Sequence, residues 1–264
     1  MSRREGTDPK MGFNDKKEEL IGGRHAVLEA LRNGKPHRII MAEGQKGAII
    51  DEITALAGQK AVRVEFLSKV DFNNAAGNIP GNQGVTAVVS PFAYCSLAEI
   101  ITLAKSTAKE PFLMMLDHLE DPHNLGAVMR TADAAGVHGL IIPSQRAAGV
   151  TATVRKVAAG AAERMPVALV GNLNQAAGTL KEKGFWLYGA EANGDHDYYR
   201  ADYCLPLVLV IGSEGRGISR LLRRNCDLLI SIPMPGTAAG SLNVSATAAV
   251  LVYTALSQRE GWSS

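Results

Sequence analysis

This chain of 264 residues has few cysteines and a net charge close to zero. The three cysteines, Cys95, Cys204 and Cys226, lie far apart and form no C-x-x-C pair, so neither a disulfide framework nor a zinc site is expected. The 28 Lys and Arg residues nearly balance the 26 Asp and Glu residues, so overall charge does not indicate nucleic-acid binding. Any contact with RNA must come from local basic patches.

Long apolar runs are also missing. No run approaches the roughly 20 residues that cross a bilayer, and the first residues, Met1 to Gly6, lack the apolar segment of a signal peptide. His118 and His123 lie near each other, but their spacing does not suit two ligands on a helix and no acidic partner completes a metal set. We therefore expect a cytoplasmic protein without a metal ion or a membrane contact.

Hydrophobic patterning divides the chain into four segments. Residues 1–19 mix acidic and basic side chains with few apolar ones, which predicts a flexible extension. Residues 20–92 alternate helical and strand patterns and predict a small α/β domain. Residues 93–110 predict a linker with a helix at 97–108, and residues 111–264 predict the second domain.

The small domain carries a loose group of basic residues near its first helix and strand. Its predicted strands are 38–41, 62–66 and 85–89, its predicted helices are 26–31 and 48–58, and the Asn- and Gly-rich residues 73–84 predict a loop. The basic group consists of Arg24, His25, Lys35, His37 and Arg38. Such a group forms either a solvated face or a surface that touches RNA, and the sequence leaves both open.

The second domain has a more regular pattern. Continuous apolar runs predict strands at 112–116, 140–142, 167–170, 186–188, 207–211 and 228–232. Helical patterns separate them at 124–135, 151–161, 173–183, 218–224 and 243–257. Fully apolar strands that alternate with helices indicate a mostly parallel sheet covered on both faces.

A glycine-rich turn follows one of these strands at Gly212-Ser213-Glu214-Gly215-Arg216-Gly217. Its spacing matches neither the dinucleotide fingerprint nor a P-loop, and Glu214 would repel a phosphate. The turn therefore favours a ligand with a positive centre, or one without phosphate. The alternative is a tight connection between strand and helix with no ligand.

A second polar turn follows the strand at 112–116. Asn124 is predicted to cap the next helix, and Gly136 to end it. Helical side chains lean toward the amino end, so Arg130 is predicted to point back over Gly126 toward a site at the helix start. The alternative is a surface arginine beside a glycine that serves packing.

Three motifs carry a family resemblance. They are Asp121–Ala127 with Arg130–Ala132, Gly212–Gly217, and Ile232–Gly236 with Ser241–Ser245. Together they resemble the motifs of the SpoU (TrmH) family of RNA ribose 2'-O-methyltransferases. The small domain resembles the RNA-binding domain of ribosomal-protein type in the RlmB-like subgroup, the 23S rRNA guanosine 2'-O-methyltransferases.

The resemblance implies an α/β-knot (SPOUT) fold, in which a carboxyl-terminal segment passes through a loop to form a deep trefoil knot. S-adenosyl-methionine would bind on the knotted loops, near Gly189, Gly212, Ile232 and Leu242. The family is dimeric, and the predicted helix at 243–257 suits an interface because it is small and apolar on most sides.

The resemblance also implies catalytic roles. The family assigns Arg130 to activate the ribose 2'-hydroxyl, but a guanidinium stays protonated, so we interpret Arg130 as an electrostatic stabiliser of the developing alkoxide. Asn124, Ser241 and Asn243 would position the ribose, Arg130 or the cofactor. Glu214 is tolerable beside a sulfonium, or fixes the loop or Arg130.

Two departures from the family pattern affect these assignments. The loop Thr237–Gly240 is one residue longer than the commonest pattern, which bears on the contacts of Leu242. Asn82 stands where relatives often have histidine, so no substrate role is assigned to it.

The leading hypothesis is methylation of a 23S rRNA guanosine by a homodimer. A tRNA ribose methyltransferase, or an rRNA methylase that gives antibiotic resistance, would carry the same motifs. A hypothesis of another class is a non-catalytic RNA-binding factor in ribosome assembly, although a pure binder needs neither Arg130, Glu214 nor Asn243.

Overall fold

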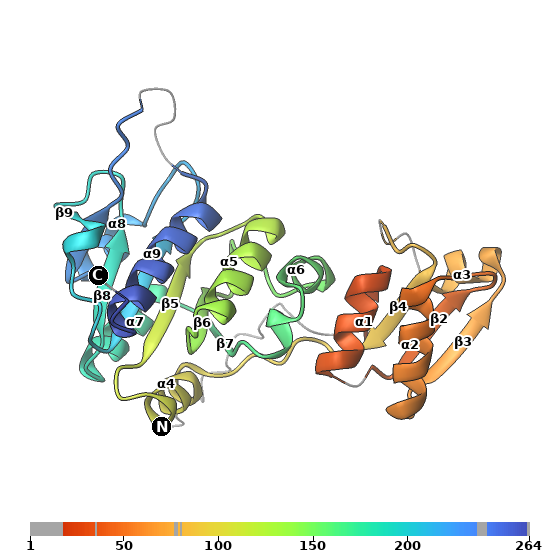
Figure 1. Ribbon diagram of the computed structural model, residues 1–264. Coiled ribbons are helices and arrows are strands. Elements are labelled where there is room, and N and C mark those ends of the chain that lie inside the picture. Colours follow the sequence, from red (N-terminus) through yellow and green to blue (C-terminus); the bar gives the residue numbers. More distant parts are fainter. Residues whose placement is uncertain (1–17, 35, 77–78, 80, 237–241, 263–264) are drawn as a thin grey trace, which may run out of the picture.

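The computed structural model describes residues 18–34, 36–76, 79, 81–236 and 242–262, and these form two sheets with their helices (Figure 1). A sheet of four strands, in the order β1-β4-β2-β3, belongs to the small unit, residues 19–89. A sheet of seven strands, in the order β7-β6-β5-β10-β8-β11-β9, belongs to the large unit, residues 95–259.

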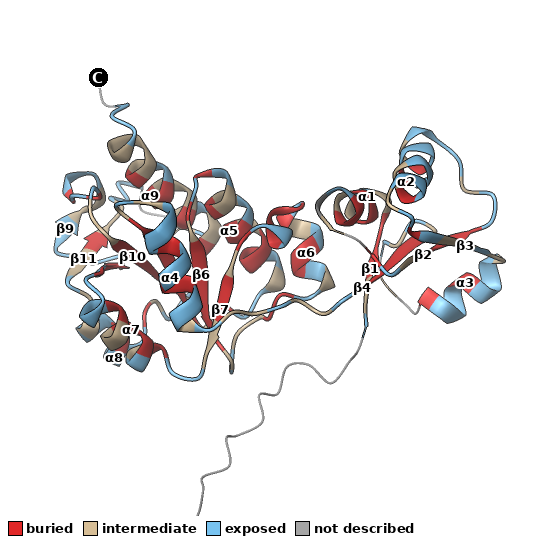
Figure 2. Ribbon diagram, turned by 90° about the horizontal axis from the view of Figure 1, so that it is seen from below, coloured by how far each residue is buried: buried red, intermediate tan, exposed pale blue. Residues whose placement is uncertain are grey.

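The small unit has helices on both faces of its sheet. Strands β2 and β3 are parallel, and β4 is antiparallel to both β1 and β2. One apolar cluster joins α1 and α2 to the sheet, and another joins α3 to the opposite face (Figure 2). The elements are β1 (Glu19–Gly22), α1 (Arg24–Asn33), β2 (Arg38–Ala42), α2 (Ala48–Gln59), β3 (Arg63–Leu67), α3 (Lys69–Ala76) and β4 (Val85–Val89).

Helix α3 corrects the prediction that residues 73–84 form a loop throughout. Its first turn is held by Ser68, whose hydroxyl accepts a hydrogen bond from the Asp71 amide at 3.2 Å. Phe72 and Ala76, four residues apart, are both buried against the sheet. Tertiary packing therefore outweighs the asparagines between them, which disfavour a helix only weakly.

The large unit confirms a parallel sheet covered on both faces. All of its paired strands run parallel. The strands are β5 (Phe112–Asp117), β6 (Gly139–Pro143), β7 (Val167–Val170), β8 (Trp186–Ala190), β9 (His196–Asp197), β10 (Leu207–Gly212) and β11 (Leu228–Ser231). The α-helices are α4 (Leu97–Thr107), α5 (Pro122–Ala134), α6 (Ala152–Ala158), α7 (Leu173–Glu182), α8 (Arg220–Asn225) and α9 (Val244–Arg259).

Two apolar clusters lie on opposite faces of this sheet. One contains residues of α5, α6 and α9, and the other contains residues of α4, α7 and α8. Helix α9 packs along α5, although the two helices are far apart in the sequence (Figure 1). The two-residue strand β9 is too short to leave a hydrophobic pattern, so the sequence did not predict it.

Helix α4 lies in the predicted linker but packs on the large sheet. Its amino end is a capping box, in which Ser96 and Glu99 each bond the other's backbone. Ile100 is fully buried, and a Cβ built on Gly139 of β6 would come 2.5 Å from the Ile100 Cδ1. The segment therefore belongs to the core of the large unit rather than to a free connection.

The predicted extension, 1–19, lies outside the described residues up to residue 17, and its last residue, Glu19, already pairs with Val89 of β4. In the part of the chain that the structure describes, no helix is long and apolar enough to cross a membrane.

Candidate active site

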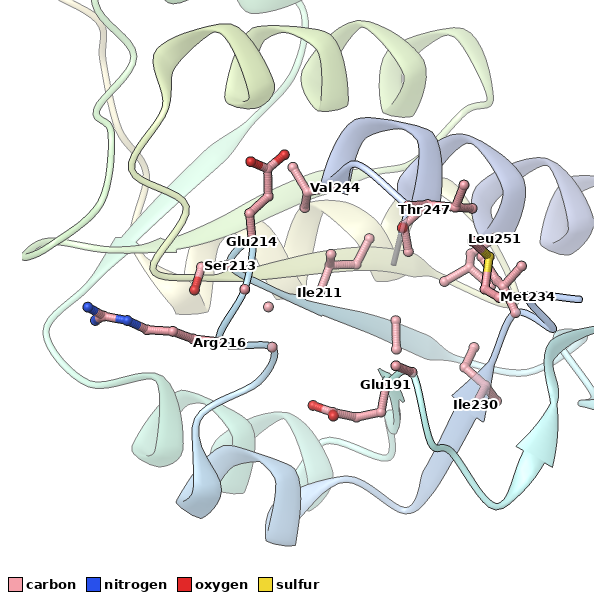
Figure 3. Close-up of a pocket in the computed structure, with 17 residues that line it drawn as sticks. Glu191, Ile211, Ser213, Glu214, Arg216, Ile230, Met234, Val244, Thr247 and Leu251 are labelled. Carbon is pink, nitrogen blue, oxygen red and sulfur yellow. The ribbon is translucent and has the colours of Figure 1, made fainter. Parts of the chain in front are cut away.

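A cavity of about 360 Å³ lies at the carboxyl ends of β8, β10 and β11. This size is within the usual range of small-molecule sites, and the carboxyl ends of parallel strands are where such sites form. Figure 3 shows its labelled side chains, which come from the segment after β8, from β10 and its following loop, from β11 and its following segment, and from the first turns of α9. The lining includes Glu191, Ile211, Ser213, Glu214, Arg216, Ile232, Met234, Leu242 and Thr247.

The glycines of the loop after β10 allow it to fold back on itself. A Cβ on Gly212 would lie 2.0 Å from the carbonyl carbon of Gly217, and the Gly217 amide donates to the Ser213 carbonyl at 3.0 Å. Gly215 and Gly217 both have positive φ, at 75° and 64°. The loop is thus a tight turn, and it also forms one wall of the cavity.

Three of the four residues predicted to contact the cofactor line this cavity: Gly212, Ile232 and Leu242. Gly189 does not line it and instead serves packing within the sheet. A Cβ there would come 2.9 Å from the Cys226 Sγ. Burial raises the pKa of the Cys226 thiol to about 12, so this sulfur stays protonated and apolar.

Glu214, Asn124 and Asn243 form one hydrogen-bonded cluster beside the cavity. The side-chain Nδ2 of Asn124 donates to the Glu214 Oε1 at 3.1 Å. The Nδ2 of Asn243 donates both to this oxygen and, at 3.2 Å, to the Asn124 Oδ1. The cluster joins the loop after β10 to the first turns of α5 and α9. Glu214 therefore fixes these two helix ends and does not pair with Arg130.

The prediction that Asn124 caps α5 is wrong. Asp121 is the capping residue, because its carboxylate accepts from the His123 amide at 2.9 Å and Pro122 occupies the first helical position. Asn124 lies inside the helix and is buried, which directs its amide toward Glu214. Gly136 ends the helix with a φ of 71°, as predicted.

Arg130 does not reach back over Gly126. The space beside Gly126 is filled by α6, since a Cβ there would come 2.6 Å from the Val157 Cβ and 2.9 Å from the Val154 carbonyl oxygen. Arg130 is exposed on α5 and lies outside the lining of this cavity and of its neighbour. Its catalytic role stays a prediction, as does that of Ser241, which lies outside the described residues.

A second cavity, of about 480 Å³, lies on the other side of the loop after β10. Ser213, Glu214, Arg216 and Gly217 line both cavities, so the loop separates two adjoining spaces. Apart from Leu119, the remaining lining of the second cavity is polar: Asp117, His118, Glu120, Asp121, Asn124, Arg146 and Ser219.

Asp117, His118 and Glu191 are absent from the residues that the motifs predict. Asp117 is buried at the end of β5, where its carboxylate accepts from the Ser219 amide at 2.6 Å and contacts the His118 Nδ1. Glu191 follows β8 and accepts from the Ile218 amide at 3.0 Å. Each of the three residues lies at the carboxyl end of a parallel strand. Because ligand sites form there, this position in the sequence could have predicted them as site residues.

Among the residues that the structure describes, no group of three or more His, Cys, Asp or Glu side chains is arranged to hold a metal ion.

The family of the chain follows from comparison with known proteins. The SpoU rRNA Methylase family matches residues 111–253, which contain both cavities, and the family of RNA 2'-O ribose methyltransferase substrate-binding domains matches residues 20–95. The chain belongs to the SpoU rRNA methylase family and is an RNA methyltransferase.

Individual relatives agree with this assignment. YacO of Bacillus subtilis, assigned to the TrmH family of tRNA/rRNA methyltransferases, is 38% identical over 242 residues, covering 91% of this chain and 96% of YacO. A Staphylococcus aureus protein of the same family is 42% identical over 245 residues, covering 92% of this chain and 97% of that protein. The crystal structure of AviRb from Streptomyces viridochromogenes with AdoMet superposes with a TM-score of 0.76 at 25% identity, covering 95% of this chain and 96% of AviRb.

Proposed function

We propose that the chain methylates the ribose 2'-hydroxyl of a guanosine in 23S rRNA, as a homodimer with the knotted fold of its family. The methyl donor is S-adenosyl-methionine, which supplies a methyl group on a sulfonium. The observation that carries the proposal is the cluster of Asn124, Glu214 and Asn243 between two adjoining cavities. One cavity suits the donor and the other suits the nucleotide.

The residues of the first cavity fit this donor. S-adenosyl-methionine has no phosphate and carries a positive centre, and the cavity presents the carboxylates of Glu191 and Glu214. Gly215 has no neighbouring atom within 4 Å of a built Cβ, so the backbone of the loop is open to an adenine at that point. Ile211, Ile232 and Leu251 add apolar surface.

The second cavity suits the ribose because it meets the first at Glu214. The reaction forms a bond between the 2'-oxygen and the methyl carbon while the carbon–sulfur bond breaks, and its electron pair stays on sulfur. The hydroxyl proton is released to water, so a neutral thioether and one proton leave for each methyl group transferred. Asn124 and Asn243, held by Glu214, would align the hydroxyl, and alignment supplies a large part of such a rate enhancement.

Arg130 would stabilise the developing negative oxygen. It lies exposed on α5, alongside α9, so bound RNA or a second subunit must complete its environment. The homodimer would use this same surface, where Tyr253 of α9 is 45% exposed. An Arg130→Ala variant with near-normal turnover would remove this residue from the mechanism.

The test is methyl transfer from labelled S-adenosyl-methionine to unmethylated 23S rRNA, with tRNA and 16S rRNA alongside, followed by mapping of the modified ribose. We expect label on a guanosine of 23S rRNA. Label on tRNA would keep the chemistry and replace the substrate. A folded chain that shows no affinity for S-adenosyl-methionine in calorimetry would instead favour the non-catalytic RNA-binding factor.

A further inference from the structure

A third cavity, of about 210 Å³, lies between the small and the large unit. The start of α1 contributes Gly23, Arg24 and His25 from the small unit, and α6 contributes Arg155 and Lys156 from the large unit. Figure 1 shows α6 as the element of the large unit that faces α1. The cavity shares no lining residue with the two cavities beside Glu214.

Arg24 is held in place without an acidic partner. Its Nη2 donates to the Gln45 Oε1 at 2.7 Å, and its own amide donates to the Gln83 Oε1 at 3.2 Å. Gln45 in turn fills the space beside Gly84, where a Cβ would come 2.2 Å from its Nε2. Within the described chain, no carboxylate neutralises Arg24, and its buried Nε has no hydrogen-bond partner.

Lys156 adds a second positive charge across the junction. Its Nζ lies over two glycines of the small unit, 3.8 Å from a Cβ built on Gly23 and 3.2 Å from one built on Gly81. Both glycines have positive φ, at 109° and 68°, and their lack of a side chain lets the ammonium approach the backbone there. Lys156 is exposed and forms no ion pair with any described acidic residue.

Arg155 gives the junction a buried cation with an unused donor. Its side chain is only 8% exposed and lies 3.7 Å from both Glu19 and Glu163, yet its Nε makes no hydrogen bond within the described residues. Glu29 also lines the cavity, but its carboxylate is paired with Arg32 at 2.8 Å. The lining carries three basic residues, Arg24, Arg155 and Lys156, and one acidic residue, Glu29, so its net charge is positive and suits an anion.

We propose that this junction binds a phosphate of the RNA backbone, with Arg24 and Lys156 as its ligands from the two units. The proposal rests on the RNA methyltransferase function above and adds a contact outside the motifs. A phosphate bound to both units would set the orientation of the substrate without reading its sequence. Lys156 thereby extends RNA binding beyond the small unit.

The experiment compares Lys156→Glu with Lys109→Glu, which makes the same charge change at an exposed lysine of the large unit, between α4 and β5. Binding of unmethylated 23S rRNA transcript is measured at several salt concentrations, together with methyl transfer and the affinity for S-adenosyl-methionine. We expect Lys156→Glu to weaken RNA binding about tenfold at low salt and to lower the slope of log K against log salt by about one. Lys109→Glu should change neither the RNA affinity nor the salt slope, and both variants should bind S-adenosyl-methionine normally.

If the two variants have equal RNA affinity and equal salt slope, the junction site is overturned, regardless of the rate of methyl transfer. An unsubstituted chain that binds rRNA through Lys156 but transfers no methyl group would refute the proposed function and leave the site standing. An unsubstituted chain without affinity for rRNA would overturn both.

Discussion

The polar residues at the strand ends and those at the junction of the two units are held in different ways. Glu214, Asn124 and Asn243 form hydrogen bonds with one another across three segments, so each side chain is held before any ligand binds. Arg24 and Lys156 keep donors without acidic partners among the described residues. A site that aligns reacting atoms needs preorganisation, whereas a site that attracts a phosphate needs free charge.

The largest effect that would sharpen this comparison comes from Gly212→Ala. Its Cβ would overlap the backbone of Gly217, which cannot move without opening the loop. We expect loss of S-adenosyl-methionine binding by more than about 100-fold and destabilisation by about 1–3 kcal/mol. Calorimetry measures the first and thermal unfolding the second. Gly178→Ala, which has open space around its Cβ, is the control, and normal cofactor affinity in Gly212→Ala would contradict the geometry.

The next effect is on turnover, through Glu214→Ala. This change leaves the amides of Asn124 and Asn243 without their shared acceptor. Hydrogen bonds to charged groups contribute about 1.5–3 kcal/mol each, so we expect methyl transfer to fall about 100-fold. Single-turnover kinetics measures this rate, with Glu182→Ala, at an exposed residue that ends α7, as the control. Equal turnover in the two variants would show that the cluster has no part in catalysis.

A smaller effect separates packing from catalysis at Gly126. Gly126→Ala gains helix propensity but places its Cβ against Val157 and Val154, so we expect a net destabilisation of about 1–2 kcal/mol in urea unfolding. Adding Val157→Ala should recover part of this loss relative to Val157→Ala alone. If the glycine instead made room for Arg130, Gly126→Ala would lower turnover and leave stability unchanged.

The smallest effect concerns Glu19 at the junction. Burial raises the pKa of its carboxyl above the usual 4.5, and Arg155 only partly opposes this. The folded state therefore holds the proton of the Glu19 carboxyl more tightly than the unfolded state does. The contribution of this group to the free energy of unfolding is full below pH 4.5 and is lost as pH rises through the folded pKa. We expect Glu19→Gln to remove this part of the pH dependence of unfolding.

Glu99 provides a control of opposite sign. Its hydrogen bond from the Ser96 amide lowers the pKa of its carboxyl, so its contribution is present above pH 4.5 and is lost as pH falls. Urea unfolding from pH 4 to pH 7 compares Glu99→Gln with Glu19→Gln. A change of the same sign in both variants would contradict the assignment for Glu19.

The fold of the large unit could be predicted because its strands are continuous apolar runs separated by helices. The family could be predicted because its motifs are short, ordered stretches such as Gly212–Gly217. Helix α3 and strand β9 could not, since the first depends on burial of Phe72 and the second is two residues long.

The sequence by itself determined which residues are available to the site, namely Asn124, Glu214 and Asn243, and where the strands that carry the loops end. Only the tertiary structure decided how they are used. In the folded chain, Asp121 rather than Asn124 caps α5, and residues of α6 rather than Arg130 fill the space beside Gly126. The reason is physical: hydrogen-bond partners and packing neighbours come from segments distant in the sequence, and local patterns do not encode them.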